Sequence, residues 1–253
     1  MNPTDFRQRL RAGDALIGTM VTLPTAATAE ILADVGFDWL FVDAEHGPLD
    51  ATDLLGILQA VGDRVPCIVR VPLCDEGWIK RVLDLGAQGI IVPQTNTPEI
   101  VSDVVRYARY APAGSRGVGL ARAHGYGFRF DEYVASANEH VAVIVQAEHR
   151  LAVDNIEEIV AVPGIDAVLL GPYDMSASYG KMGQITDPEI TSAIARVITT
   201  CRSAGISVGS FGVTADAVRT YAEQGCSLLC AGVDVLFLGG GARKMHSEVV
   251  NEQ

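Results

Sequence analysis

Short apolar runs recur along the whole chain, and polar segments with helical end signals separate them. Most of the runs are continuous rather than alternating, which is typical of parallel strands that are buried on both faces. Eight strands are predicted, at Ala15–Val21, Trp39–Val42, Cys67–Val71, Gly89–Val92, Val141–Val145, Ala167–Leu170, Ile206–Phe211 and Ser227–Val233.

The segments between these runs carry residues that begin and end helices. Thr97-Pro98-Glu99 combines a capping hydroxyl, a proline at the first helical position and an acid in the first turn. Asp187-Pro188-Glu189 repeats this arrangement, and a further helix is expected to start at Thr214 and end at Gly225. The pattern is therefore one of strands that alternate with helices.

Such alternation predicts a parallel sheet, and eight units in 253 residues fit a closed (β/α)₈ TIM barrel, with residues 1–253 as a single domain. An open doubly wound sheet is the alternative. It is disfavoured because Leu23–Ala27, and no Gly-x-Gly-x-x-Gly turn, follows the first run. Two long inserts, Pro112–His140 and Gly171–Asp187, are expected among the functional loops at the carboxyl end of the barrel.

Acidic residues outnumber basic ones, which narrows the choice of partners. The chain has 31 Asp and Glu against 19 Lys and Arg, a formal net charge of −12, and 49% hydrophobic residues. This is the composition of a globular protein. Nucleic acid is disfavoured as a partner, because its phosphates need a basic face. An anionic small substrate would need cations placed locally.

The sequence shows neither a membrane-spanning run nor a signal peptide, which bears on the cellular compartment. No apolar run approaches the roughly 18–20 residues that span a bilayer, and the polar segment Met1–Arg11 has no signal-peptide core. We therefore expect a cytoplasmic protein with no membrane partner. The cysteines are odd in number, and reduced thiols packed in the core are expected at Cys67, Cys74, Cys201, Cys226 and Cys230.

Polar groups cluster at the carboxyl ends of four predicted strands. These are Asp43–Pro48, Arg70, Gln146–Glu148 and Gly171–Asp174. Because catalytic side chains of a barrel stand at these ends, the four groups predict an active site.

Glu148 and Asp174 end neighbouring parallel strands. Each alone is compatible with a cap or a loop turn, but two acids this close repel unless a cation or a proton lies between them. A shared divalent cation is the better interpretation. Carboxylates and water suit Mg²⁺ or Mn²⁺, and they do not exclude Co²⁺ or Zn²⁺.

His46 and Arg70 are the candidates for proton transfer and charge stabilisation. His46 follows a strand and has acids beside it, which favours a general base over a structural histidine. Arg70 interrupts an apolar strand. It is either a clamp for a carboxylate or oxyanion, or a structural ion pair with Asp43 or Glu45.

The lysines bear on whether a Schiff-base mechanism is available. A Schiff base needs a buried lysine at the reacting centre, and none of Lys80, Lys181 and Lys244 ends a predicted strand. A metal is therefore expected to serve as the electron sink.

Six segments together resemble the class II, metal-dependent pyruvate aldolases of the HpcH/HpaI family, the 4-hydroxy-2-oxoheptanedioate aldolase group. The resemblance covers nearly the whole chain, and Asp43–Pro48 is its most specific part. The other segments are Ile68–Pro72, Gly89–Pro93, Ala113–Gly117, Gln146–Glu148 and Gly171–Ser176.

The resemblance implies reversible aldol cleavage of 4-hydroxy-2-oxo acids into an aldehyde and pyruvate or hydroxypyruvate, as in aromatic compound catabolism. It implies metal binding by Glu148 and Asp174, and a homohexamer that exchanges its C-terminal helix between subunits. The remaining implied roles are His46 as base with Asp43 nearby, Asp84 raising the basicity of His46, Arg70 stabilising the enolate, and Gln146, Gly171, Pro172, Tyr173 and Asp174 contacting the 2-oxo acid.

This chain departs from the family pattern at Tyr173, at Ala147 and His149, and at Lys181-Met182-Gly183. These departures bear on which aldehyde the protein accepts as the second substrate.

Two other functions remain open. A barrel isomerase or lyase could bind a phosphorylated substrate at Gly209–Gly212 and Ala231–Asp234, where barrels often hold phosphate. A non-catalytic binding protein would leave the polar strand ends unexplained.

Overall fold

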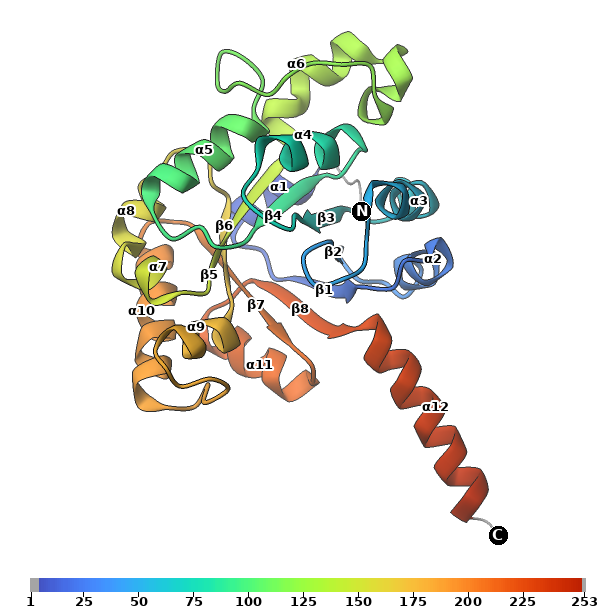
Figure 1. Cartoon of the computed structure of the whole chain (residues 1–253), viewed down its shortest axis with the longest axis vertical. Helices are drawn as coiled ribbons and strands as arrows, with labels where there is room; N and C mark the ends of the chain where they lie inside the picture. Colours follow the sequence, from blue (N-terminus) through green and yellow to red (C-terminus); the bar gives the residue numbers. More distant parts are fainter. Residues whose placement is uncertain (1–4, 252–253) are drawn as a thin grey trace.

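The computed structural model describes residues 5–251 and shows eight parallel strands that close into a barrel (Figure 1). The strands lie in chain order, and the last pairs with the first, which confirms the predicted (β/α)₈ barrel. Their bounds are β1 (Leu16–Val21), β2 (Trp39–Asp43), β3 (Cys67–Arg70), β4 (Gly89–Val92), β5 (Ala142–Ala147), β6 (Ala167–Leu170), β7 (Ser207–Gly212) and β8 (Leu228–Val233).

Helices connect and surround the strands (Figure 1). Their bounds are α1 (Phe6–Ala12), α2 (Ala26–Ala33), α3 (Ala51–Val61), α4 (Glu76–Asp84), α5 (Pro98–Ala108), the 3₁₀ segment η2 (Arg122–Gly127), α6 (Phe130–His140), α7 (Arg150–Asp154), α8 (Ile156–Val160), α9 (Pro172–Ser178), α10 (Pro188–Ser203), α11 (Ala215–Gln224) and α12 (Asp234–Asn251).

The predicted helix ends are confirmed in their details. The Thr97 hydroxyl accepts a hydrogen bond from Ile100 N at the start of α5. The Asp187 carboxylate accepts one from Glu189 N, at 2.9 Å, at the start of α10. Gly225 ends α11 with a φ of 103°, a left-handed conformation that glycine adopts without steric cost.

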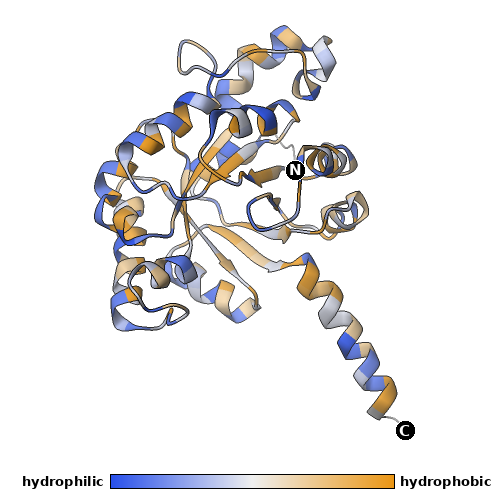
Figure 2. Ribbon diagram, in the orientation of Figure 1, coloured by the Kyte–Doolittle hydropathy of each residue, from blue (hydrophilic) through white to orange (hydrophobic). Residues whose placement is uncertain are grey.

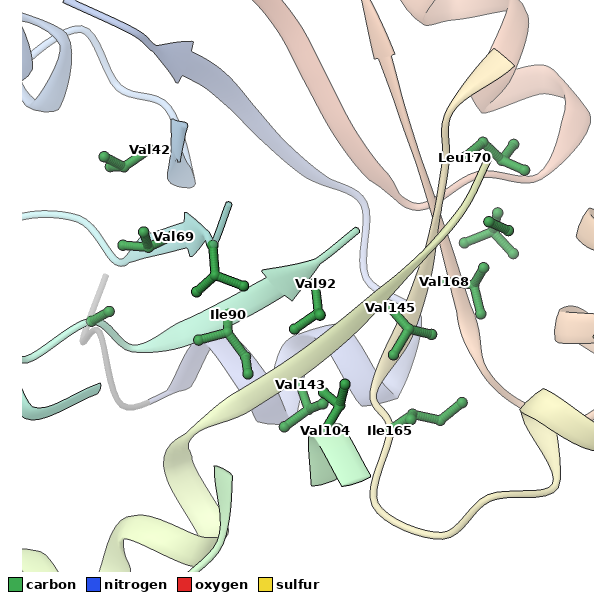
Figure 3. Packing of buried hydrophobic residues seen from close by; sticks show 14 of the residues in the cluster. Val42, Val69, Ile90, Val92, Val104, Val143, Val145, Ile165, Val168 and Leu170 are labelled. Carbon is green, nitrogen blue, oxygen red and sulfur yellow. The ribbon is translucent and has the colours of Figure 1, made fainter. Parts of the chain in front are cut away.

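Alternate residues of each strand face two different apolar layers. Phe41 and Ile68 belong to the smaller buried cluster, inside the barrel. Val42 and Val69 belong to the larger cluster, which the surrounding helices complete (Figure 3). The strands are accordingly among the most hydrophobic parts of the chain (Figure 2). The barrel is filled by side chains, so its polar groups gather at the ends.

Helix α1 packs on the amino end of the barrel. Its Phe6 and Leu10 are fully buried in the inner cluster. Arg7 Nε donates to both oxygens of Asp166, at 2.8 and 2.9 Å, just before β6. With this end covered, the carboxyl end is where a ligand can reach the strand ends.

The two long inserts lie at opposite ends of the barrel. The segment 112–140 follows α5, and α5 runs back toward the amino end; Arg122 within this segment donates to the carbonyls of Leu58 and Leu85, near the ends of α3 and α4. The expectation that this insert is a functional loop at the carboxyl end is wrong for that reason. The segment 171–187 follows β6 directly and contains α9, so for this insert the expectation is confirmed.

The cysteines are free thiols. Cys67, Cys201, Cys226 and Cys230 are buried, as expected, and Cys74 is partly exposed. Burial raises the pKa of Cys67, Cys201 and Cys226 to about 12, so these thiols behave as apolar packing groups.

Helix α12 leaves the barrel and projects away from it (Figure 1). Asp234 anchors its start, because the buried carboxylate accepts hydrogen bonds from Thr22 N, Thr22 Oγ1 and Leu23 N. Along the helix, large apolar side chains are exposed, including Leu236, Leu238 and Val249. None of the helices within residues 5–251 combines the length and apolar character needed to cross a membrane.

Candidate active site

Side chains from neighbouring strands meet at the carboxyl end of the barrel. Asp43 and Arg70 end β2 and β3 and are partners in the sheet register. Gln146 lies in β5, and Glu148 follows it. Asp174 lies in the first turn of α9, directly after β6. The structure therefore brings together five residues that the sequence predicted as one site.

Arg70 is the cation around which the acids are arranged. Its Nε and Nη2 donate to the two oxygens of Asp43, at 2.8 Å each. Its Nη1 lies 3.1 Å from Glu45 Oε2 and 3.5 Å from Gln146 Oε1, and the guanidinium carbon sits 5.1 Å from the centre of the Phe41 ring. The structural ion pairs with Asp43 and Glu45, which were the alternative to a substrate clamp, are therefore present. Nη1 nevertheless faces the site.

The neighbouring acids keep this guanidinium charged. Burial alone lowers the pKa of Arg70, but the hydrogen bonds and charge of Asp43, with the charges of Glu45 and Glu148, outweigh burial and raise it. Arg70 therefore supplies the local positive charge that an anionic substrate requires.

Glu148 is almost completely buried and is held by amide groups. Its Oε1 accepts hydrogen bonds from Gln94 N at 2.7 Å and Gln94 Nε2 at 2.9 Å, and its Oε2 contacts Gln146 Nε2. Burial raises the pKa of Glu148; the Gln94 N–H opposes this shift, and the charges of Glu45 and Asp174 add to it. Oε1 thus accepts two donors, whereas Oε2 accepts one and keeps a lone pair for a further partner.

Gly171 leaves the space in which Glu148 lies. A Cβ atom at position 171 would stand 2.6 Å from Glu148 Cβ, 3.1 Å from Glu148 Oε2 and 3.3 Å from Gln146 Nε2. Any larger residue must push both side chains aside. The glycine before α9 is therefore required by close packing against the site.

The charges of the site suit a divalent cation. Asp43 and Glu45 pair with the guanidinium of Arg70, the charge of Glu148 also acts on it, and Asp174 lies near Glu45 and Glu148. Within residues 5–251, no group of three or more His, Cys, Asp and Glu side chains is arranged to hold a metal ion. A cation at Glu148 and Asp174 would thus need oxygens from substrate and water, which Mg²⁺ and Mn²⁺ accept.

His46 lies in the turn after β2, with most of its side chain exposed. Its Nε2 is 3.8 Å from Glu45 Oε2. Asp43 Oδ1 accepts hydrogen bonds from the backbone N–H groups of Glu45, at 3.1 Å, and His46, at 3.4 Å. Asp43 therefore holds the turn that carries His46. Gly47 lets this turn fold back closely onto the Asp43 carbonyl.

The predicted substrate-binding residues of α9 differ in exposure. Pro172 is buried, whereas Tyr173 and Asp174 are exposed at the first turn of the helix. The Tyr173 side chain, which is 60% exposed, faces solvent at this end of the barrel. Their contact with a 2-oxo acid stays a prediction.

Asp84 lies away from the other predicted site residues. It is the last residue of α4, at the end that leads into β4, and its Oδ1 accepts a hydrogen bond from Arg116 Nη2 at 2.7 Å. Within residues 5–251 the structure brings Asp84 to Arg116, at the barrel end opposite His46. An effect of Asp84 on His46 is thus not carried by a contact within one chain, and it stays a prediction.

Three residues of the site were not predicted from the sequence. Glu45 was noted only as a neighbour of His46 and as a possible ion-pair partner of Arg70. Gln94 adopts a left-handed backbone, with φ of 55°, that aims its N–H at Glu148. Thr95 is buried; its hydroxyl donates to Gln146 O and accepts from Gln146 N, both at 3.0 Å. The available signal was a pair of polar residues directly after the apolar run of β4.

Fold and site together define a barrel enzyme scaffold with an acidic, arginine-containing active site. The HpcH/HpaI aldolase/citrate lyase family model matches residues 17–238. The chain belongs to this family.

Individual relatives agree with this assignment. The 4-hydroxy-2-oxovalerate aldolase of Rhodococcus jostii (strain RHA1) is 41% identical over 235 residues, covering 92% of this chain and 91% of that protein. The hydroxypyruvate/pyruvate aldolase of Pseudomonas aeruginosa is 39% identical over 243 residues, covering 95% and 90%. A crystal structure of a family protein from Burkholderia cenocepacia J2315 matches with a TM-score of 0.93 and 38% identity, covering 97% of this chain and 99% of that one.

Gly171→Ala tests the packing that shapes the site. We expect the new methyl group to displace Glu148 and Gln146 and to weaken Mn²⁺ binding by roughly 10–100-fold, as loss of a supporting contact typically does. Isothermal titration with Mn²⁺ measures this. Gly56→Ala is the matched control, because a Cβ there meets nothing within 4 Å. Wild-type affinity in Gly171→Ala would show that the close contact does not position Glu148.

Proposed function

We propose that the protein is a class II aldolase that reversibly cleaves a 4-hydroxy-2-oxo acid into an aldehyde and a 2-oxo acid, pyruvate or hydroxypyruvate. The observation that carries this proposal is the set of buried or partly buried acids around Arg70 at the mouth of the barrel. The curated relatives support it, since those proteins are named as 4-hydroxy-2-oxovalerate aldolase and hydroxypyruvate/pyruvate aldolase.

Glu148 and Asp174 would hold the divalent cation, with Mg²⁺ or Mn²⁺ favoured by an all-oxygen donor set. When bound, such a cation acts as a Lewis acid on the 2-oxo group, which acidifies the protons at C3. Gln94 and Gln146 orient the Glu148 carboxylate toward the site through their amide groups.

Arg70 and His46 are the side chains that would stabilise charge and transfer protons. Arg70 Nη1 can stabilise the negative charge that develops on the enolate oxygen, because Asp43 fixes the guanidinium through its other two nitrogens. His46, exposed on its turn, removes the C3 proton of the 2-oxo acid or returns it. Gln146 Oε1, 3.5 Å from Arg70 Nη1, borders the same space.

A phosphorylated substrate fits the structure less well. At the β8 end, where such a site is expected, Asp234 is buried and its carboxylate accepts hydrogen bonds from the Thr22 and Leu23 backbone. A buried carboxylate at this strand end would repel the like charge of a phosphate. The isomerase alternative is disfavoured on this ground.

Removal of the metal tests the proposed chemistry. We expect a chelator to abolish cleavage of a 4-hydroxy-2-oxo acid, and Mg²⁺ or Mn²⁺ to restore it, as measured by coupled detection of pyruvate. Glu148→Ala and Asp174→Ala should stay inactive after metal addition and keep the circular dichroism of the wild type. Cleavage that persists in chelator, or metal-dependent turnover in either variant, would refute the ligand assignment.

Proton exchange without an aldehyde tests His46. His46→Ala should slow deuterium wash-in at C3 of pyruvate by roughly 10²–10⁴-fold, the usual contribution of a general base. Nuclear magnetic resonance at matched metal concentration measures the exchange rates of the wild type and the variant. An exchange rate near wild type in His46→Ala would mean that another group takes the proton.

We propose that the protein forms a homohexamer that exchanges α12 between subunits. The support is that α12 projects from the barrel with exposed apolar side chains, among them Leu236 and Val249 (Figure 1). Apolar residues are also exposed on the barrel itself, at Ile17 of β1 and Ile31 of α2.

Light scattering tests this assembly. At micromolar concentration the mass should be six times the 26.8 kDa of one chain. Leu238→Glu should lower it, because a charge would have to be buried at the contact. A mass of one chain for the wild type would contradict the assembly.

A further inference from the structure

The loop between β4 and α5 treats the two oxygens of Glu148 differently. Gln94 donates to Glu148 Oε1 twice, from its backbone N–H at 2.7 Å and from its side-chain Nε2 at 2.9 Å. The other oxygen, Oε2, receives one amide donor, Gln146 Nε2. Both donors of Gln94 therefore fall on a single oxygen of the carboxylate.

The backbone of Gln94 adopts a conformation that residues with a side chain rarely take. Its φ of 55° lies in the left-handed region. Strained residues of this kind cluster at functional sites, where the surrounding structure holds them. Strand β4 has ended at Val92, and the left-handed turn that follows aims the Gln94 N–H at Glu148. The strain therefore accompanies a contact to the proposed metal ligand.

The two residues after Gln94 hold the loop in this conformation. The hydroxyl of Thr95 is bonded to the backbone N and O of Gln146, at 3.0 Å each. The carbonyl of Asn96 accepts a hydrogen bond from Asn155 Nδ2, at 2.9 Å, at the junction of α7 and α8. The loop is thus fastened to β5 on one side and to the helix layer on the other.

Asn96 also decides which way the Gln94 amide points. Asn96 Nδ2 donates to Gln94 Oε1 at 3.3 Å, so that Gln94 Nε2 is the atom that faces Glu148. Turning both amides over would give a donor to Asn96 Oδ1, which is buried and has none within residues 5–251. It would also set Gln94 Oε1 against the Glu148 carboxylate, acceptor against acceptor. A hydrogen bond to a charged acceptor is roughly twice as strong as a neutral one, so the donating orientation prevails.

This arrangement limits how Glu148 can bind a cation. A carboxylate oxygen has about two lone-pair sites, and the two Gln94 donors use both sites of Oε1, whereas Oε2 keeps one. Glu148 can therefore offer a cation one oxygen rather than two. Ca²⁺ is larger, takes more oxygen ligands and often uses both oxygens of one carboxylate, whereas Mg²⁺ demands a near-ideal octahedron. Mn²⁺ accepts the same octahedral set of oxygens.

Resting on the proposed aldolase function, we propose that Gln94, oriented by Asn96, is a positioning residue that restricts Glu148 to binding through one oxygen and thereby favours Mg²⁺ or Mn²⁺ over Ca²⁺. Gln94 acts on the carboxylate and not on the cation, so its role is separate from that of the two proposed metal ligands. Gln94 is exposed at the mouth of the barrel, and water can reach Oε1 when the amide is removed. A cation displaces a water, whereas it does not displace an amide that the chain holds in place.

Two affinities measured on the full chain test the proposal. Isothermal titration with Mn²⁺ and with Ca²⁺, at a fixed concentration of pyruvate, compares the wild type with Gln94→Met, which keeps the length of the side chain and removes its amide. We expect the Mn²⁺ affinity to fall by roughly 10–100-fold, as after loss of other supporting hydrogen bonds, and the Ca²⁺ affinity to fall by less. The preference for Mn²⁺ over Ca²⁺ should then drop by about 10-fold.

Two further variants separate the amide from the backbone. Gln94→Gly adopts the left-handed conformation without strain and keeps the backbone N–H, so it should lose the same preference as Gln94→Met although its loop is not distorted. Gln224→Met, at an exposed glutamine that ends α11, is the matched control and should keep the wild-type preference. A crystal structure with Mn²⁺ should show Oε2 of Glu148 on the cation and Oε1 still bonded to Gln94.

The outcomes distinguish this inference from the proposed function. If the wild type binds neither cation, the metal assignment within the aldolase proposal fails, and the role of Gln94 fails with it. If the wild type binds Mn²⁺ and cleaves its substrate but shows no preference over Ca²⁺, the role of Gln94 alone is refuted. The same holds if both Gln94 variants keep the preference, or if both oxygens of Glu148 bind the Mn²⁺.

Discussion

The buried ion pair between Arg70 and Asp43 is the interaction on which the site depends. Two hydrogen bonds of 2.8 Å lock the guanidinium at the end of β3, and the same Asp43 carboxylate holds the turn that carries Glu45 and His46. Breaking such a buried pair by removing one partner typically costs about 3–5 kcal/mol. One side-chain pair thus sets the position of the guanidinium, the Glu45 carboxylate and the His46 imidazole.

A second set of contacts fixes Glu148 from the opposite side of the site. Gln94 donates from both its backbone and its side chain, and its left-handed conformation makes this double donation possible. Thr95 ties the strand end to the Gln146 backbone, and Gly171 leaves room beneath the carboxylate. Small polar and glycine positions therefore decide where the acid points.

Negative charge is concentrated at this end of the barrel, and burial makes it costly. Each carboxylate raises the pKa of its neighbours, as Glu45 and Glu148 show. The charge of one arginine does not balance four acids, so the arrangement is stable only with a further cation or with protons. The same excess of negative charge is what would favour a bound divalent cation.

The sequence by itself determined the barrel and most of the residues of its site. Continuous apolar runs and helix caps such as Thr97 specify alternating strands and helices. The carboxyl ends of parallel strands meet in any such barrel, so Asp43, Arg70, Gln146 and Glu148 had to converge however far apart they lie in the chain.

Only the tertiary structure decided which partner each polar group finds. Strand order does not reveal that Arg70 binds Asp43 through two nitrogens and places the third, Nη1, 3.1 Å from a Glu45 oxygen, because that depends on side-chain directions and distances. Nor does local sequence show that the insert with Arg122 returns to the amino end, or that Asp84 meets Arg116 there. Spacing along a chain predicts which end of a strand a residue occupies, whereas hydrogen bonds are settled by three-dimensional packing.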